Sequence, residues 1–445
     1  MRDIALLVVI AGALLPVLKW PYIGVYLWTW LGFMNPHRLT WGFAYYLPFA
    51  QVTAIVTLLA LLVSKEPKRI PWTRETITLL IFIVWMFFTT FFALYPDLAW
   101  TQWNKVWKIM FMVYLTLMLI NTRQKLDWLV WIIVISLGFY GVKGGIFTIA
   151  HGGAYHVQGP AETFIGGNNE IALALIMTIP LMRYLQLNVQ NVWINRGMIL
   201  AMWLTAIAAI GSQSRGALVG MVAMLAFLWI KSRNRLFTFI AILMIAGAVV
   251  SIMPQTWWDR MASIQDYEQD ESATNRINAW WTAFYIAQDH VTGGGFETWK
   301  AQVFQIYAPN PDEHPDVHSI YFEVMGEHGF IGFAIFMILA LFTWNTGSRI
   351  KRRARQREET KWAADLASMV QVSLVGYAST GAFLGLAYFD YYYTLIAIIV
   401  ICKTLSFNEL ECLEQGEGKD KATVTGAGGR VRNDAGSLID RQTSG

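Results

Sequence analysis

Residues 197–231 read GMILAMWLTAIAAIGSQSRGALVGMVAMLAFLWIK, which is two long apolar runs joined by a short polar segment. Each run holds almost no charge, and Arg215 and Lys231 stand only at the ends of the second run. A helix that crosses the ~30 Å hydrocarbon layer of a membrane needs about 20 mostly apolar residues. The stretch therefore predicts two membrane-spanning helices that meet at a tight turn.

The same pattern extends over the rest of the chain. Of the 445 residues, 56% are hydrophobic and 14% are charged, against roughly 25% charged in a soluble domain. The 21 Trp and 18 Tyr residues fit amphipathic rings at membrane interfaces. We predict an all-α polytopic membrane protein with about twelve transmembrane helices. Their apolar runs lie near 4–33 (interrupted by Pro16 and Pro21), 43–63, 77–93, 103–121, 126–141, 168–183, 197–211, 215–231, 236–253, 317–345, 364–386 and 391–407.

Lys and Arg residues in the short loops predict the orientation of these spans, because such residues are enriched on the cytoplasmic side. In a twelve-span arrangement five basic loops all fall on one side, and the richest of them, 349–361, holds seven Lys and Arg residues. Both termini are then expected in the cytoplasm. The other four loops carry Lys65, Lys68, Arg69 and Arg74; Arg123 and Lys125; Arg183 and Arg196; and Lys231, Arg233 and Arg235.

The opposite side of the membrane is expected to hold one large loop domain, residues 254–316. This segment contains ten acidic and three basic residues. An apolar stripe at helical spacing predicts a helix over 272–287 within it. The chain is then divided into nine spans over 1–253, a periplasmic loop domain over 254–316, three spans over 317–407 and a disordered cytoplasmic tail over 408–445.

Two arginines stand where the outer membrane face is predicted. Arg215 lies in the polar turn 211–216, and Arg276 lies near the start of the predicted loop helix. A guanidinium presents a planar fork of donors that matches phosphate oxygens, and a helix N-terminus adds positive potential. Both are therefore candidates for binding an anion. Structural roles stay open: Arg215 can be an interfacial residue or a helix cap, and Arg276 can pair with Asp270 or Glu271.

His318 ends the segment EHPDVH at 313–318, directly before the tenth apolar run. An imidazole can accept a proton from a hydroxyl near neutral pH, so His318 is a candidate general base. A structural histidine at the interface is an alternative. A metal cluster of His314, Asp316 and His318 is another, although a spacing of two residues around a proline matches no known metal motif.

Three further residues are secondary candidates. Tyr321 and Glu323 follow His318 in the same stretch, and Lys143 can add positive charge at the outer face or simply extend toward water. The pattern Asn168-Asn169-Glu170 is typical of a helix start and requires no function. The two cysteines, Cys402 and Cys412, indicate neither a disulfide framework nor a metal site.

Three motifs follow one another in the second half of the chain: NRINAW at 275–280, DHVTGGGF at 289–296 and HSIYFEVMGEHG at 318–329. With the SRG turn at 214–216, they resemble the O-antigen ligase and O-antigen polymerase superfamily. The N-terminal segment, which begins MRDIALLVVI and includes GFMNPHRLTWGFA, resembles the branch of O-glycosylation ligases associated with the exosortase system. Two departures are visible, since Ser319 stands where the family has Asn after His318, and Val291 where it often has Pro.

This resemblance implies a GT-C-like fold and an inverting, metal-independent glycosyltransferase without a cofactor, in the bacterial inner membrane. The implied donor is a glycan linked to undecaprenyl diphosphate, and the implied acceptor is lipid A–core or another glycan at the periplasmic face. By position, Arg215 and Arg276 would hold the diphosphate and His318 would activate the acceptor hydroxyl.

Other functions stay possible from sequence. A polymerase, or a protein O-oligosaccharyltransferase, of the same superfamily would use a different acceptor. A transporter of lipid-linked glycans should show ionisable groups near the middle of the membrane and a two-fold repeat, and the centres of the predicted spans are almost free of charge. The net charge of +4 requires no nucleic-acid partner.

Overall fold

The computed structural model describes residues 1–232, 234–262 and 271–428, and these fold into helices without any strand. The α-helices are α1 (Arg2–Lys19), α2 (Tyr22–Met34), α3 (Phe49–Val63), α4 (Arg74–Thr90), α5 (Pro96–Leu119), α6 (Arg123–Ala150), α7 (Asn168–Asn188), α8 (Val192–Gly211), α9 (Arg215–Lys231), α10 (Arg235–Ile252), α11 (Gln255–Ala262), α12 (Glu271–Asp289), α13 (Ala301–Tyr307), α14 (Ile320–Ala354), α15 (Lys361–Thr380) and α16 (Asp390–Gly428). Short 3₁₀ helices are η1 (Pro36–Leu39), η2 (Phe43–Tyr46) and η3 (Gly381–Phe383).

Each of the twelve predicted apolar runs contains a helix, and the first contains two. Within the described residues, α6, α7, α8, α14 and the segment Lys361–Phe383 are long and apolar enough to cross a membrane. The protein is therefore a helical, multi-pass membrane protein. Twelve crossings and a GT-C-like arrangement stay predictions.

The helices of the bundle pack closely through small residues. α6 lies along α8, and a Cβ atom placed on Gly145 would come within 2.2 Å of the Leu204 carbonyl oxygen. Gly141 faces Thr205 in the same interface, with its ideal Cβ 2.2 Å from Thr205 Oγ1. Glycine lets two helix backbones approach each other, as is usual in membrane proteins. α15 occupies the interior, between α7, α9 and α14.

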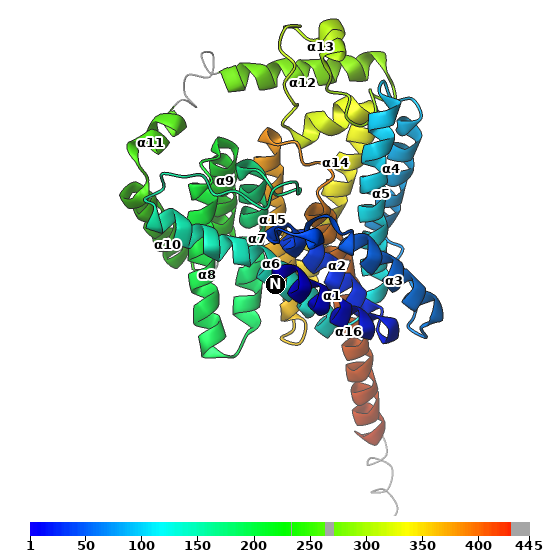
Figure 1. The fold of residues 1–445 in the computed structure, drawn as a ribbon. Helices are drawn as coiled ribbons and strands as arrows, with labels where there is room; N and C mark the ends of the chain where they lie inside the picture. The colour runs from blue at the N-terminus through cyan, green and yellow to red at the C-terminus, as the bar shows by residue number, and fades with distance from the viewer. Residues whose placement is uncertain (233, 263–270, 429–445) are drawn as a thin grey trace, which may run out of the picture.

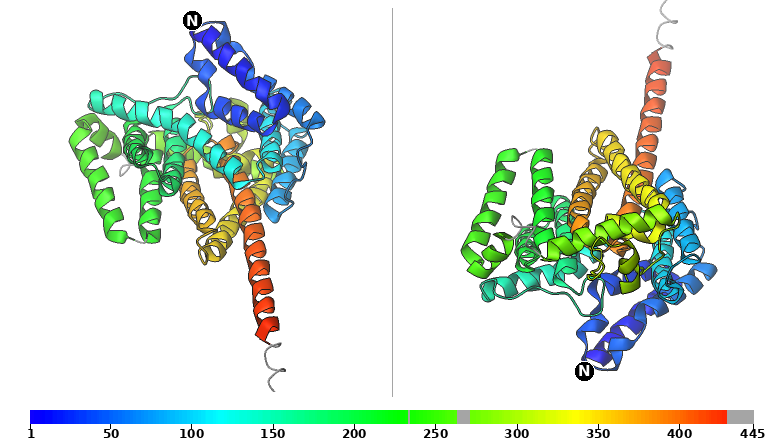
Figure 2. Two further views of the ribbon diagram at one scale, coloured as in Figure 1. Left: turned by 90° about the horizontal axis from the view of Figure 1, so that it is seen from below. Right: turned by 90° about the horizontal axis from the view of Figure 1, so that it is seen from above.

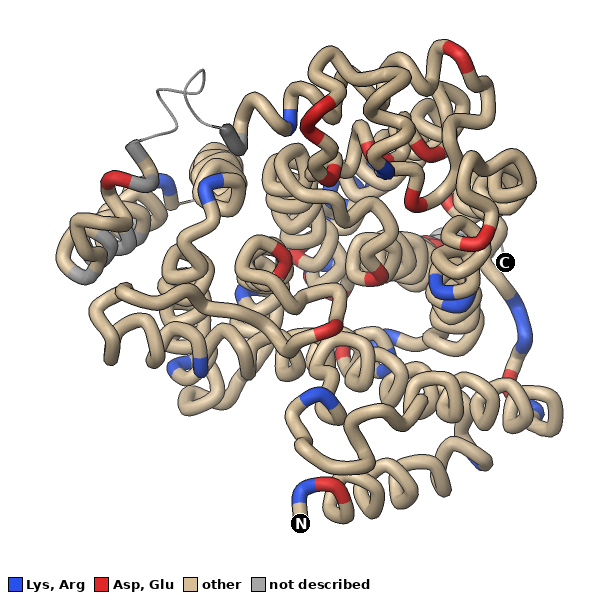
Figure 3. The backbone as a smooth tube through the Cα atoms, turned by 45° about the horizontal axis from the view of Figure 1, so that its top comes forward, with Lys and Arg blue, Asp and Glu red and all other residues tan. Residues whose placement is uncertain are grey.

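The segment that contains α12 and α13 covers one end of the bundle. Figure 1 shows α12 and α13 at this end, and the right view of Figure 2 shows α12 lying across it. The predicted helix over 272–287 is confirmed as α12, which extends from Glu271 to Asp289. Acidic positions gather toward this end, as Figure 3 shows. The predicted orientation of the ends relative to the membrane stays a prediction.

The C-terminal helix α16 leaves the bundle from the opposite end (Figure 1). Disorder was expected from residue 408, but α16 continues as a helix to Gly428. The first part of this extension, NELECLEQ, is rich in Leu and Glu, which are good helix formers, so low hydrophobicity alone is a poor sign of disorder here. The expectation for 429–445 lies outside the described residues.

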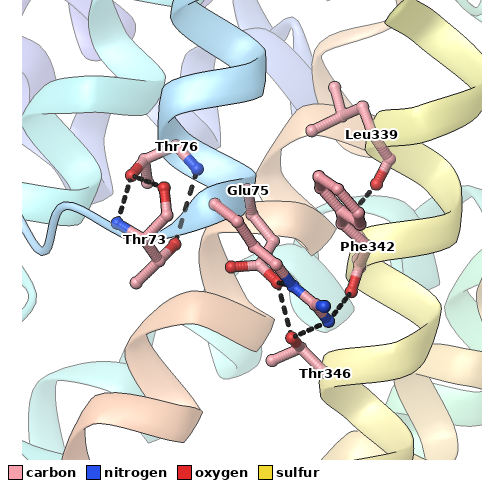
Figure 4. Close-up of polar contacts among 8 residues, drawn as sticks. Thr73, Glu75, Thr76, Leu339, Phe342 and Thr346 are labelled. Carbon is pink, nitrogen blue, oxygen red and sulfur yellow. Dashed lines mark hydrogen bonds and ion pairs between the residues drawn. The ribbon is translucent and has the colours of Figure 1, made fainter.

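A buried ion pair joins α4 to the distal half of α14 (Figure 4). Glu75 is fully buried, and its Oε1 accepts hydrogen bonds from Arg74 Nε at 2.9 Å and from Thr346 Oγ1 at 2.5 Å. Arg74 also donates to the Phe342 carbonyl at 3.2 Å. Opposite charges are thus adjacent in this contact, which reduces the cost of burying them.

Candidate functional site

α14, which begins next to His318, is broken at Gly329. Gly329 has φ of 68° and ψ of −176°, so the helix stops after His328 and restarts beyond it. A helix end leaves carbonyl groups without partners. Here the backbone N–H groups of Gly294 and Gly295 donate to the carbonyls of Gly326 and Glu327, at 2.8 Å and 2.9 Å. The motifs 289–296 and 318–329 are therefore one structural unit.

Glycine is required where this unit is tightest. Gly293 has φ of +67°, and a Cβ atom added to it would lie 2.5 Å from the backbone nitrogen of Gly329. Gly295 has φ of +79°, and its Cβ would lie 2.2 Å from that of Ala93. The left-handed conformation and the close approach both favour glycine. The triple glycine thus supports the helix break and contacts no ligand site directly.

α12 is fixed over the first half of α14. The ring of Trp280 stacks on Phe322, with centroids 5.0 Å apart and an interplanar angle of 8°, and its Nε1 donates to the Val317 carbonyl at 3.0 Å. The Asn278 side chain exchanges hydrogen bonds with the backbone of Asn310. These contacts bring the start of α12, with Arg276, to the segment that carries His318.

His318 adopts a left-handed backbone conformation, with φ of 42°. Such a conformation is uncommon for a residue other than glycine, and backbone strain of this kind gathers at functional sites. The next residue, Ser319, is the N-cap of α14, yet its hydroxyl makes no capping bond and is buried without a partner among the described residues. The imidazole is half-buried.

One pocket brings Arg215, Arg276 and His318 together. It has a cavity volume of about 220 Å³, and we name it the basic pocket. Among the described residues, no carboxylate lines it. The full lining is Asn169, Ser214, Arg215, Gly216, Arg276, His318, Thr380, Phe383 and Leu384.

Three helices begin at the basic pocket. Asn169 lies in the first turn of α7, Arg215 is the first residue of α9, and His318 stands just before the N-cap of α14. N-terminal ends of helices present N–H groups and the positive end of the helix dipole. The turn before α9 is held in place by Asn168, whose Nδ2 donates to the Ser212 carbonyl at 2.9 Å. The pocket therefore combines two guanidinium groups with several helix ends of the same sign.

The two arginines act on each other electrostatically. Burial lowers the pKa of Arg276, and the neighbouring charge of Arg215 lowers it further. The Nε atom of Arg276 is buried and has no hydrogen-bond partner among the described residues. An anion in the pocket would relieve the repulsion and accept a hydrogen bond from the Arg276 Nε–H group. The arrangement is chemically suited to bind a phosphate or diphosphate beside an imidazole.

The secondary candidates lie elsewhere. Lys143 is exposed on α6 and does not line the basic pocket. Tyr321 donates its hydroxyl to the Ala378 carbonyl at 2.9 Å, a contact between α14 and α15. Glu323 lines a separate cavity, where its Oε2 accepts from the backbone N–H of Ala387 at 2.9 Å.

The pocket also contains residues that sequence reasoning missed. Asn169 was taken as part of a helix-start pattern, which is where the structure places it, but it also lines the pocket. Thr380, Phe383 and Leu384 come from the end of α15 and the segment after it. Nothing in the sequence distinguishes these three from ordinary residues of an apolar run.

The metal hypothesis for the segment before α14 has no support in the geometry. Among the residues that the structure describes, no three His, Cys, Asp or Glu side chains lie where they could share a metal ion. His314 is exposed, and Asp316 lines the separate cavity with Glu323, while His318 lines the basic pocket.

Fold and site together define a multi-pass helical membrane protein with a pocket that two arginines and a histidine line. Residues 200–337, which include Arg215, Arg276 and His318, match the family model described as O-Antigen ligase. The predicted resemblance to the O-antigen ligase superfamily is therefore confirmed over these residues. Residues 1–190 match a family of unknown function (DUF5935). A comparison with curated proteins gives no match.

Proposed function

We propose that this protein is an O-antigen ligase, which transfers a glycan from undecaprenyl diphosphate to lipid A–core at the periplasmic face of the bacterial inner membrane. The match of residues 200–337 to the O-antigen ligase family model supports a ligase or polymerase type of function in O-antigen biosynthesis. The observation that carries the proposal is the meeting of Arg215, Arg276 and His318 in one pocket, although Arg215 and His318 are 103 residues apart in the sequence.

The arginines bind and stabilise the leaving group in this scheme. Transfer releases a diphosphate, whose negative charge grows as the glycosyl bond breaks. Fixed donors aimed at developing charge lower a barrier more than donors that must reorganise. Arg215 and Arg276, with the N-terminal ends of α7 and α9, supply such donors at the basic pocket. This arrangement lets the reaction proceed without a metal ion.

His318 is the general base of the scheme. The acceptor hydroxyl gives its proton to the imidazole, and its oxygen forms a bond to the anomeric carbon of the donor glycan. The bond from that carbon to the phosphate oxygen breaks, and its electron pair stays on undecaprenyl diphosphate. Attack from the face opposite the leaving group inverts the anomeric centre. A positioned base contributes roughly 10²–10⁴-fold to such a step.

The test is transfer by the purified, full-length protein, with an undecaprenyl-diphosphate glycan as donor and rough lipopolysaccharide as acceptor. We expect the glycan on lipid A–core, at an unchanged rate in EDTA. Growth of the chain on the lipid carrier would instead identify a polymerase. Loss of transfer in EDTA that a divalent cation restores would refute the metal-independent mechanism. No product with either acceptor would make a protein acceptor the next assay.

A further inference from the structure

A second cavity adjoins the basic pocket and has the opposite charge. Its volume is about 500 Å³, within the range of small-molecule sites. We name it the carboxylate cavity, because five of its lining residues are acidic and one, Lys300, is basic; four aromatic residues also line it. The acidic residues are Glu170, Glu297, Asp316, Glu323 and Glu327.

The two spaces share a thin wall beside His318. Leu384 lines the basic pocket, and the next residue, Gly385, lines the carboxylate cavity. A Cβ atom on Gly385 would lie 3.5 Å from Glu323 Oε2 and 3.8 Å from the backbone nitrogen of His318. On the other side of the wall, Asp316 and His318 are two residues apart and line the different spaces. A ligand in the carboxylate cavity would thus lie next to the proposed base.

The carboxylates are held by neutral donors. Glu327 is 3% exposed, and its two oxygens accept from the Glu297 backbone N–H at 2.9 Å and from the Tyr388 hydroxyl at 2.6 Å. Within the described part of the chain, the one ion pair that these five residues make is Glu297 with Lys300, at 3.9 Å. Glu170, Glu323 and Glu327 are buried or half-buried and have no cationic partner among the described residues, and such acids in a membrane protein indicate a functional site.

Trp299 gives the cavity a fixed aromatic wall. A Cβ atom on Gly326 would come within 2.4 Å of Trp299 Cη2, so the ring packs directly on α14 at a glycine. Carboxyl oxygens accept hydrogen bonds. A ligand that fits must therefore offer many donors and an apolar face for the indole ring. A sugar ring has hydroxyl groups around its edge and C–H groups on its face, and meets both requirements.

We propose that the carboxylate cavity binds a sugar unit of one of the two saccharides that the reaction joins. The proposal rests on the proposed function for the identity of these saccharides. The shared chemistry is an uncharged, hydroxylated ring, which belongs either to the donor glycan or to the acceptor. The basic pocket then binds the anionic diphosphate and the carboxylate cavity binds an uncharged sugar, with His318 between the two spaces.

Binding to the full-length protein tests this with three probes: bare undecaprenyl diphosphate, undecaprenyl diphosphate carrying its glycan, and core oligosaccharide cleaved from rough lipopolysaccharide. The variants are Glu323→Gln, whose amide oxygen can still accept from Ala387, and Trp299→Leu. We expect about tenfold weaker binding of one saccharide-bearing probe and unchanged binding of the bare carrier. The affected probe identifies the source of the sugar. Asp312→Asn, an exposed acid outside the cavity, is the matched control.

Wild-type binding of both saccharide probes in both variants would overturn the proposal, and so would equal weakening of the bare carrier. Failure of the wild-type protein to bind either saccharide beyond the bare carrier would overturn it as well. The proposed function fails separately, if bare undecaprenyl diphosphate does not bind or Arg276→Ala does not weaken it. Size-exclusion profiles of the variants show whether each one is folded.

Discussion

Charged residues are arranged differently at the two ends of α14. At the distal end, Glu75 and Arg74 are 2.9 Å apart, and Thr346 satisfies the carboxylate further. At the end near α12, charges are grouped mostly by sign: two arginines line the basic pocket, and five acids with a single lysine, Lys300, line the carboxylate cavity. Opposite charges in contact neutralise each other and connect helices. Like charges kept together repel, and a ligand of the opposite character relieves that repulsion.

The two ends of α14 thus differ in whether an opposite charge lies directly beside the buried one. Burying a charge is costly, and pairing it offsets much of that cost. Where charges of opposite sign lie in two separate spaces, the free-energy cost of burying them is not offset until substrates bind. The predictions below therefore differ in kind between the two ends of α14: variants near His318 should change transfer, and variants near Glu75 should change stability.

The largest effect is expected for His318→Ala. Loss of the base should lower kcat about 10²–10⁴-fold, with the protein still present in the membrane at normal abundance. His318→Asn is a second variant, because Asn tolerates the left-handed conformation that His318 adopts. His314→Ala, an exposed histidine four residues earlier, is the control. Full activity of both His318 variants would remove this residue as the base.

Arg276→Ala should have the next largest effect. Removing one hydrogen-bond donor that stabilises the leaving group lowers the rate about 10²–10³-fold in comparable sites. Here we expect the loss in kcat/KM for the glycan-bearing lipid substrate. Arg276→Lys keeps the charge and loses the planar fork, so its activity should lie between those of Arg276→Ala and the wild type. Equal activity of the Lys and Ala variants would show that charge at this position does not matter.

At the other end of α14, Arg74→Ala should reduce stability by about 3 kcal/mol, because it leaves Glu75 buried without a cation. We expect a lower midpoint of thermal unfolding in detergent and unchanged kcat/KM per folded molecule. The double variant Arg74→Ala/Glu75→Gln should recover part of the loss. A fall in transfer that exceeds the fall in folded protein would mean that the ion pair also supports the site.

Much of the fold could be predicted because a membrane-spanning helix requires a continuous apolar run, which is visible in the local sequence. Every apolar run became a helix, and the loop helix was found from its apolar stripe. The break at Gly329 was not predicted, since an apolar run that contains glycine is common in spans. Only its contact with the segment 293–295, distant in sequence, reveals the reason.

The candidate site divides in the same way. Arg215, Arg276 and His318 could be selected because charged or ionisable groups are rare in such a chain, and the structure gathers all three. Thr380 and Leu384 could not, because side chains of their type line helix contacts throughout the bundle. The carboxylate cavity was also missed as a whole, since its acids come from four separate segments.

The smallest effect is expected for Lys143→Ala. Lys143 was a candidate for the same anion, but it is exposed on α6 and outside the basic pocket. Exposed substitutions away from a site usually change free energies by less than ~0.5 kcal/mol, or about twofold. We therefore expect kcat/KM for the donor within about twofold of wild type at low salt, where surface charge acts most strongly. A tenfold loss would mean that positive charge on the outer surface, beyond the basic pocket, also recruits the diphosphate. Functional charge would then extend beyond the end of α14 that lies near α12.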